Sequence, residues 1–162
     1  MKFSLAAIAL VLISCAPALS QPQSLGPKDT LASTGLSKQE IHQVIEAVEP
    51  TAYDTPESWE TELRARKLSL GSTAGASATG LVVQGSNLLC GATANCQTWV
   101  LRKSNGKWWS LIPGDQAPIA ESFEFGPGVS HGIRDLTIVA NSSAESGSRV
   151  TYKFDGKVYR VK

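Results

Sequence analysis

The chain has almost no net charge, and this excludes a large class of partners. Its 15 Lys and Arg residues nearly balance its 14 Asp and Glu residues. Tight binding to the phosphate backbone of DNA or RNA requires a basic surface. Attraction to an anionic membrane face depends on the same kind of charge. We therefore expect no nucleic-acid partner and no charge-driven contact with a membrane.

Histidine and cysteine are scarce too, which leaves little material for a metal centre. The chain has two His and three Cys residues. A zinc site usually has C-x2-4-C spacing and a second ligand pair, and no second pair accompanies Cys90 and Cys96. Residues 71–80 lack the Lys-Ser/Thr of a phosphate loop, and no helix pattern follows Gly126-Pro127-Gly128, as a dinucleotide site requires. We expect neither a metal nor a cofactor.

No apolar run is long enough to cross a bilayer. Residues 3–13 are uncharged and apolar except for Ser4, whereas a membrane helix needs roughly 20 apolar residues. A short apolar run behind Met1-Lys2 is typical of a secretory signal peptide. We therefore expect a protein exported from a bacterial-type cell, either periplasmic, secreted or anchored to the cell envelope by lipid.

Two processing routes for this signal are open. Ala18-Leu19-Ser20 has small residues at the two positions that signal peptidase reads, which predicts a signal peptide over residues 1–20. Leu12-Ile13-Ser14-Cys15 resembles the bacterial lipobox. That resemblance implies a lipoprotein signal over residues 1–14 and a lipid on Cys15, which would then be the link to the membrane.

The rest of the chain divides into a linker and one domain. Residues 21–35 are rich in Pro, Gly, Ser and Thr, which predicts a flexible linker. Residues 36–162 are predicted to form a single globular domain, because roughly 125 residues can build one hydrophobic core. Loss of Lys2 with the signal leaves 14 basic and 14 acidic residues.

Cysteine usage fits export. Cys15 lies in the leader or carries lipid, so Cys90 and Cys96 remain as the one pair in the folded part. An isolated pair in an oxidising compartment predicts a disulfide. With five residues between the two cysteines, the bond would staple a short turn.

One helix is indicated near the start of the domain. Ser37 and Glu40 have the spacing of a capping box, and Leu36 and Ile41 have that of a hydrophobic staple. Apolar residues then recur at positions i, i+3, i+4 and i+7, namely Ile41, Val44, Ile45 and Val48. Pro50 is expected to end this helix.

After the helix the pattern changes to short strands and turns. Strands are predicted over residues 62–70, 81–83, 97–103, 107–112, 121–125, 134–140, 149–154 and 157–161, with a loop over 71–80. Asn105-Gly106 and Asp155-Gly156 each predict a hairpin turn. The expected fold is α+β and mainly β. One N-terminal helix precedes an antiparallel sheet, sandwich or small barrel of about seven or eight strands.

One short motif is typical of hydrolases. Residues 128–132 read Gly-Val-Ser-His-Gly and match G-x-S-x-G, a pattern that requires a helix after the serine and a later histidine. Here a strand pattern follows, and no His lies beyond His131. We interpret the stretch as a Gly/Pro-rich loop in which Ser130 and His131 are not catalytic. A small hydrolase with a site around these two residues is the alternative.

Three tryptophans lie on the arms of the Asn105-Gly106 hairpin. Trp108 and Trp109 are adjacent to each other and Trp99 is on the other arm. Adjacent residues of a strand point to opposite faces, so one ring can enter a core while the other needs a cover or stays exposed. The N-terminal helix could cover it. Exposed aromatics mark binding sites, so Trp99, Trp108 and Trp109 are the candidate binding residues.

Two resemblances to known proteins complete the sequence analysis. The stretches 95–100, 132–136 and 152–159, the last reading Tyr-Lys-Phe-Asp-Gly-Lys-Val-Tyr, resemble a pattern in small exported bacterial proteins of uncharacterised function. Ser146-Gly147-Ser148-Arg149 loosely resembles the recognition loop of periplasmic lysozyme inhibitors, although the Tyr of that loop is displaced to Tyr152. The sequence thus favours an exported, non-catalytic binding module with a protein or glycan partner, for example an inhibitor of an extracellular enzyme.

Overall fold

The computed structural model describes residues 21–48, 56–73, 76–86, 89–91, 95–113, 116–143 and 146–162. The predicted signal, Cys15 and Pro50 lie outside these residues. The helical elements are η1 (Ala32–Thr34), α1 (Lys38–Val48) and α2 (Pro56–Glu62). The strands are β1 (Leu63–Thr73), β2 (Ala76–Gly85), β3 (Cys96–Ser104), β4 (Lys107–Ser110), β5 (Ile119–Ala120), β6 (Ser122–Ser130), β7 (Ile133–Ser143), β8 (Ser146–Phe154) and β9 (Tyr159–Val161). No helix among the described residues is long and apolar enough to cross a membrane.

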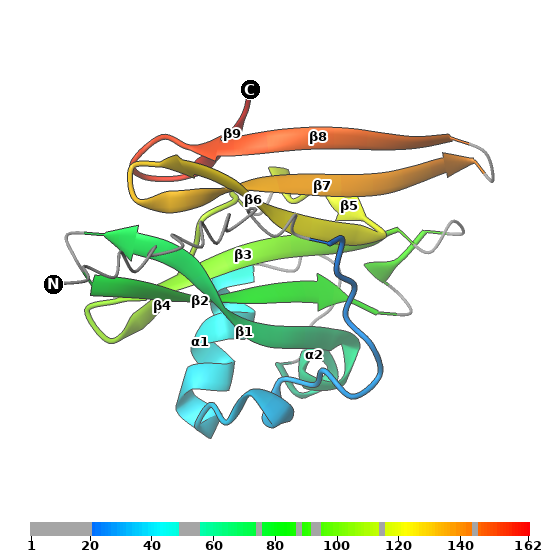
Figure 1. The fold of residues 1–162 in the computed structure, drawn as a ribbon. Coiled ribbons are helices and arrows are strands. Elements are labelled where there is room, and N and C mark those ends of the chain that lie inside the picture. Colours follow the sequence, from blue (N-terminus) through cyan, green and yellow to red (C-terminus); the bar gives the residue numbers. More distant parts are fainter. Residues whose placement is uncertain are drawn as a thin grey trace, which may run out of the picture.

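The strands form one curled antiparallel sheet. Over the described residues, nine strands join in the order β4-β3-β2-β1-β7-β8-β9, with β5 beside β3 and β6 beside β7. The sheet curls into a half-barrel, so that β6 to β9 lie over one face of β1 to β4 (Figure 1). The helices α1 and α2 lie against the other face. The expected mainly β fold with an N-terminal helix is confirmed.

The middle of β2 and of β3, residues 81–83 and 99–101, is buried on both faces of the sheet. Leu81 and Val83 contribute to a core shared with α1 and α2, while Val82 between them packs into a second core with β6 to β9. The alternation of side chains along a strand produces this division. Since both faces need apolar side chains, the central strands read as continuous apolar runs rather than as alternating patterns.

Helix α1 begins where the capping box predicts. The Ser37 backbone N–H donates to Glu40 Oε2 at 2.9 Å, and the Glu40 N–H donates to Ser37 Oγ at 3.3 Å. The four apolar residues of its predicted face, Ile41, Val44, Ile45 and Val48, are all buried. Lys103 of β3 adds an ion pair to Glu40 at 2.7 Å. These contacts fix the helix on the strands that carry the tryptophans.

Both predicted hairpins form, with different turns. Asn105 and Gly106 have φ angles of 51° and 77°, the left-handed pair that a two-residue turn requires. The β8–β9 turn is longer, because Phe154 pairs with Tyr159 and four residues lie between them. In this turn Asp155 Oδ1 accepts hydrogen bonds from the N–H groups of Lys157 and Val158.

Two segments that we predicted as loops are strands. Within residues 71–80, those at 71–73 belong to β1 and those at 76–80 to β2, with Ser72 paired with Ser77. The sequence did not indicate these strand ends, because their small polar residues give no apolar alternation. The G-x-S-x-G stretch lies in β6 and in the turn to β7, where Ser130 pairs with Ile133. Gly126 to Gly128 form an irregularity that β6 accommodates before that turn.

The predicted linker is laid against the sheet. The Gln23 N–H donates to the Phe123 carbonyl at 2.7 Å, and the Phe123 N–H donates back at 2.8 Å. Asp29 pairs with Arg66 at 2.7 Å, and Leu31 is fully buried. Three residues of the predicted linker, Gln23, Asp29 and Leu31, thus contact the rest of the domain.

Candidate functional site

The three predicted tryptophans occupy different environments. Trp99 and Trp108 are 1% and 3% exposed and pack in the core that α1 and α2 cover. Trp109 points to the other face of β4 and is 53% exposed. Helix α1 therefore covers one of the two adjacent rings and leaves the other in solvent. Of the three, only Trp109 offers a ring to a partner.

Trp109 has one basic neighbour on its own strand and one on the paired strand. Lys107 Nζ is 5.1 Å from the centre of the Trp109 ring, within the range of a cation–π contact. Arg102 is the direct partner of Trp109 across the β3–β4 ladder, and its guanidinium lies 5.8 Å from the centre of the Phe154 ring. We call Lys107, Trp109 and Arg102 the Trp109 surface. It combines a flat apolar face with two positive charges.

The two ends of the sheet meet at a seam. The Tyr159 N–H donates to the Leu111 carbonyl at 2.7 Å, which joins the start of β9 to the residue after β4. Since every step of the path from β4 to β9 is antiparallel, β4 and β9 run in the same direction. The next bond of a parallel ladder would need an N–H from residue 113. Pro113 has none, so the ladder cannot continue with that bond.

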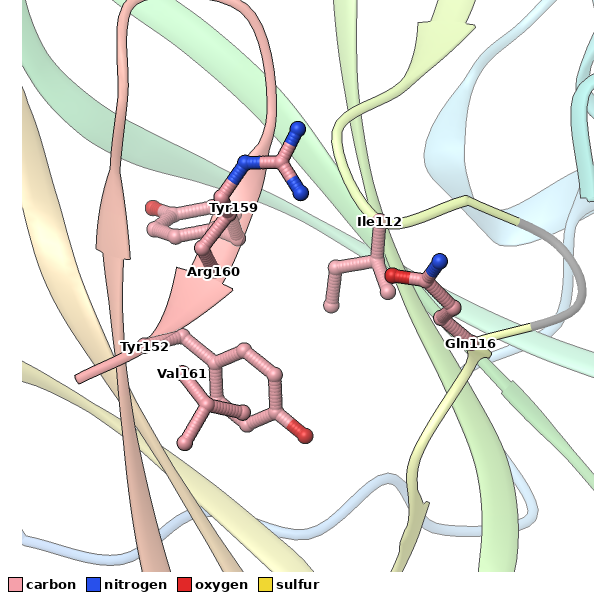
Figure 2. A pocket seen from close by; sticks show the side chains of 6 residues that line it. All are labelled: Ile112, Gln116, Tyr152, Tyr159, Arg160 and Val161. Atoms are coloured by element: carbon pink, nitrogen blue, oxygen red, sulfur yellow. The ribbon is translucent and has the colours of Figure 1, made fainter.

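A pocket of about 460 Å³ lies at this seam. It is lined by Ile112, Gln116, Tyr152, Tyr159, Arg160 and Val161. Figure 2 shows Arg160 and Tyr152 on one side and Gln116 on the other, with Ile112 between them. Its volume lies in the range of natural ligand pockets. We call it the seam pocket.

The two tyrosines of the seam pocket differ in their partners. The Tyr159 hydroxyl donates to the Arg134 carbonyl at 2.7 Å, which fixes its ring. Burial raises the pKa of both Tyr159 and Tyr152 above the ordinary value, so both hydroxyls keep their protons at neutral pH. These residues are the first and last of the stretch 152–159, whose spacing could have drawn attention to them. That they share a pocket with Ile112 follows only from the closure of the sheet.

Ser130 is hydrogen-bonded to Asp135, and His131 lies in the turn after it. Ser130 Oγ donates to Asp135 Oδ1 at 2.7 Å, so its proton faces a carboxylate rather than an imidazole. His131 has a φ of 49° in the β6–β7 turn, and its ring lies near Gly156. Lys153 Nζ approaches Asp135 at 3.7 Å. Asp135 turns toward Ser130, while the neighbouring Arg134 donates to the carbonyl of Gly126.

Cys90 and Cys96 form the predicted disulfide. The bond closes a turn in which the Gly91 N–H donates to the Asn95 carbonyl at 2.8 Å. Asn95 is 5% exposed, and its side chain both donates to the Asn141 carbonyl and accepts from the Asn141 N–H. The stapled turn is thereby attached to the far end of β7.

Ser146 to Arg149 are part of a strand rather than a loop. They begin β8 and pair with β7, with Gly147 opposite Asn141. Arg149 is held by Glu124 at 2.8 Å. The loose resemblance to an inhibitor loop therefore falls on the edge of a sheet. Among the described residues, no group of three or more His, Cys, Asp or Glu side chains could hold a metal ion.

Comparison with known proteins gives no relative on which to base a function. No protein-family model matches the chain. The searches of curated proteins and of solved structures likewise find no match.

Proposed function

We propose that this protein is an exported, non-catalytic binding module that recognises an acidic ligand through the Trp109 surface. The observation that supports the proposal is the 53% exposure of Trp109 beside the basic residues Lys107 and Arg102. A large aromatic ring costs free energy when it is left in water. Aromatic and Arg side chains are also the residues that dominate binding energy in interfaces.

The chemistry of the surface narrows the ligand. The ring of Trp109 offers stacking or apolar contact, while Lys107 and Arg102 offer charge to a carboxylate, sulfate or phosphate group. An acidic glycan or an acidic patch on a protein has both features. The resemblance to lysozyme inhibitors favours one form of this function, the inhibition of an extracellular enzyme.

The test compares two exposed apolar residues. The mature chain is fluorescently labelled and tested for binding to an array of acidic and neutral oligosaccharides and to a panel of extracellular hydrolases, lysozymes included. Trp109→Ala should weaken binding to the ligand found by about tenfold or more. Ile119→Ala is the matched control, because Ile119 is 58% exposed on β5, and it should bind like the wild type.

Charge is tested in the same format. Lys107→Gln should weaken binding to an acidic ligand and reduce its salt dependence. Full binding by Trp109→Ala would place recognition elsewhere on the molecule and overturn the proposal. Inhibition of a hydrolase in the panel, lost in Trp109→Ala, would identify the inhibitor form of the function.

A further inference from the structure

Strand β9 turns one backbone edge toward the seam pocket. The Lys162 N–H donates to the Thr151 carbonyl, so Lys162 and Thr151 are a hydrogen-bonded pair. In an antiparallel ladder such pairs alternate with pairs whose backbone groups point away. Val161, opposite Tyr152, is therefore of the second kind. Its N–H and C=O face away from β8 and toward the seam.

The same alternation explains the single bond across the seam. Tyr159 also faces away from β8, and its N–H is the group that donates to Leu111. Beyond this bond, Pro113 cannot donate to the Tyr159 carbonyl because it lacks an N–H. The chain after Leu111 thus leaves the ladder, and the edge at Val161 lines the seam pocket instead of a neighbouring strand.

The walls of the pocket suit an apolar side chain. Its accessible apolar surface comes from the half-buried ring of Tyr152 and the exposed side chain of Val161, while Ile112 and Tyr159, 1% and 2% exposed, lie behind them. An extended peptide that pairs with a strand edge places alternate side chains on one side. Such a peptide, paired with Val161, would direct one of its side chains toward this apolar surface.

The mouth of the pocket carries the ion pair of Arg160 and Asp155. Asp155 Oδ2 accepts a hydrogen bond from Arg160 Nε at 2.6 Å and holds the side chain. Figure 2 shows the two terminal nitrogens of Arg160 directed toward the side of Ile112 and Gln116. These nitrogens are the pair that binds a carboxylate in a bidentate manner. The pocket therefore favours a ligand with an acidic group near its apolar one.

We propose that the seam pocket binds an extended peptide segment of a partner protein, which pairs with the outer edge of β9, packs an apolar side chain against Tyr152 and Val161 and presents a carboxylate to the terminal nitrogens of Arg160. Main-chain bonds supply affinity in this mode of recognition, and the pocket and Arg160 supply specificity. This site is separate from the Trp109 surface, and its test does not depend on that surface.

The experiment uses an array of acetylated and amidated pentapeptides with Leu, Val, Phe or Tyr at the centre and Glu, Gln or Lys two positions later. The mature chain is the probe, and binding is followed by amide chemical shifts of the labelled protein. Peptides with Glu should bind about fivefold more tightly than those with Lys. Arg160→Gln should abolish this preference. The shifts should include those of Val161, Tyr159 and Ile112.

The main-chain contact is tested from both partners. Val161→Pro removes one N–H that faces the seam and keeps the pairing with β8, since proline is tolerated on an edge strand. This variant should bind the best peptide about fivefold to tenfold more weakly. N-methylation of the peptide should weaken binding to the wild type in the same way. Val161→Ala keeps the N–H and is the matched control. Trp109→Ala should bind the peptide like the wild type.

Three results would overturn the proposal. One is the lack of any peptide that shifts Val161 and Ile112 at about 1 mM. Another is that Val161→Pro binds the peptide, and the wild type binds the N-methylated peptide, as tightly as the wild type binds the unmodified peptide. The pocket would then take an isolated side chain and not a strand. The third is binding that depends on Trp109 and not on Arg160, which would place the peptide on the Trp109 surface.

Discussion

The adjacent residues Trp108 and Trp109 should respond in opposite ways to replacement by Ala. Trp108 is 3% exposed, and a large aromatic removed from a core costs about 3–5 kcal/mol. Trp109 is 53% exposed and would lose mainly its contact with Lys107, which is worth about 0.5–1 kcal/mol at an exposed site. The free energy of unfolding should therefore differ between the two variants by at least about 2 kcal/mol.

A third variant separates the ring from its polar atom. The buried Nε1 of Trp108 has no hydrogen-bond partner among the described residues, and an unsatisfied donor of this kind costs about 1–3 kcal/mol. Trp108→Phe removes the donor and keeps an aromatic ring, so it should be much less destabilising than Trp108→Ala. Urea unfolding followed by far-UV circular dichroism measures all three, with comparable slopes required for the comparison. Equal destabilisation by Trp108→Ala and Trp109→Ala would refute the reasoning and remove the support for the Trp109 surface.

Three further predictions concern the helix cap, the disulfide and Ser130. The hydrogen bond from Lys103, followed by those from Ser37, lowers the pKa of Glu40 from 4.5 to about 2. A carboxylate whose folded-state pKa is depressed adds stability that is complete above the unfolded value and is lost as the pH falls toward the folded one. Glu40→Gln should therefore reduce the loss of thermal stability between about pH 4.5 and about pH 2. For the disulfide, the loop it closes is short, with a sequence separation of 6, so reduction should cost about 2 kcal/mol. Intact mass should show no free thiol on Cys90 or Cys96 in exported material, and two free thiols would contradict the assignment. Ser130 should remain unlabelled by a fluorophosphonate probe, because its hydroxyl donates to Asp135; labelling that disappears in His131→Ala would support the hydrolase alternative.

The parts of the fold that follow local rules could be predicted from the sequence. The capping box at Ser37 and Glu40, the Asn105-Gly106 turn and the Cys90–Cys96 pair all depend on residues that are close together in the chain. Residues 71–80 obey no such rule. Their small residues give no pattern, and 71–73 and 76–80 are strands because they continue the pairing of β1 with β2. At Gly71 a Cβ atom would lie 2.4 Å from the Gly132 carbonyl oxygen, so glycine is there for a close approach rather than for a loop.

The candidate sites also combine features that local sequence predicts with features that only the fold determines. Alternation along β4 correctly implied that Trp108 and Trp109 face different ways, but the sequence could not say which ring α1 covers. Ile112 and Tyr159 share the seam pocket because one backbone hydrogen bond, from Tyr159 to Leu111, joins distant segments of the chain. Only Pro113, which limits that ladder, is a local sign of it. Residues assembled by closure of a sheet are found from the fold rather than from spacing.

The attachment of Asn95 to Asn141 has a consequence for the order of folding. These residues are 46 positions apart, and contacts of such long sequence separation form slowly because the intervening chain must first be brought together. Closing the Cys90–Cys96 turn restricts the conformations open to Asn95 before that encounter. We expect oxidised protein to refold faster than reduced protein. Oxidation of this pair would then contribute to the rate at which the two halves of the half-barrel join, in addition to its effect on stability.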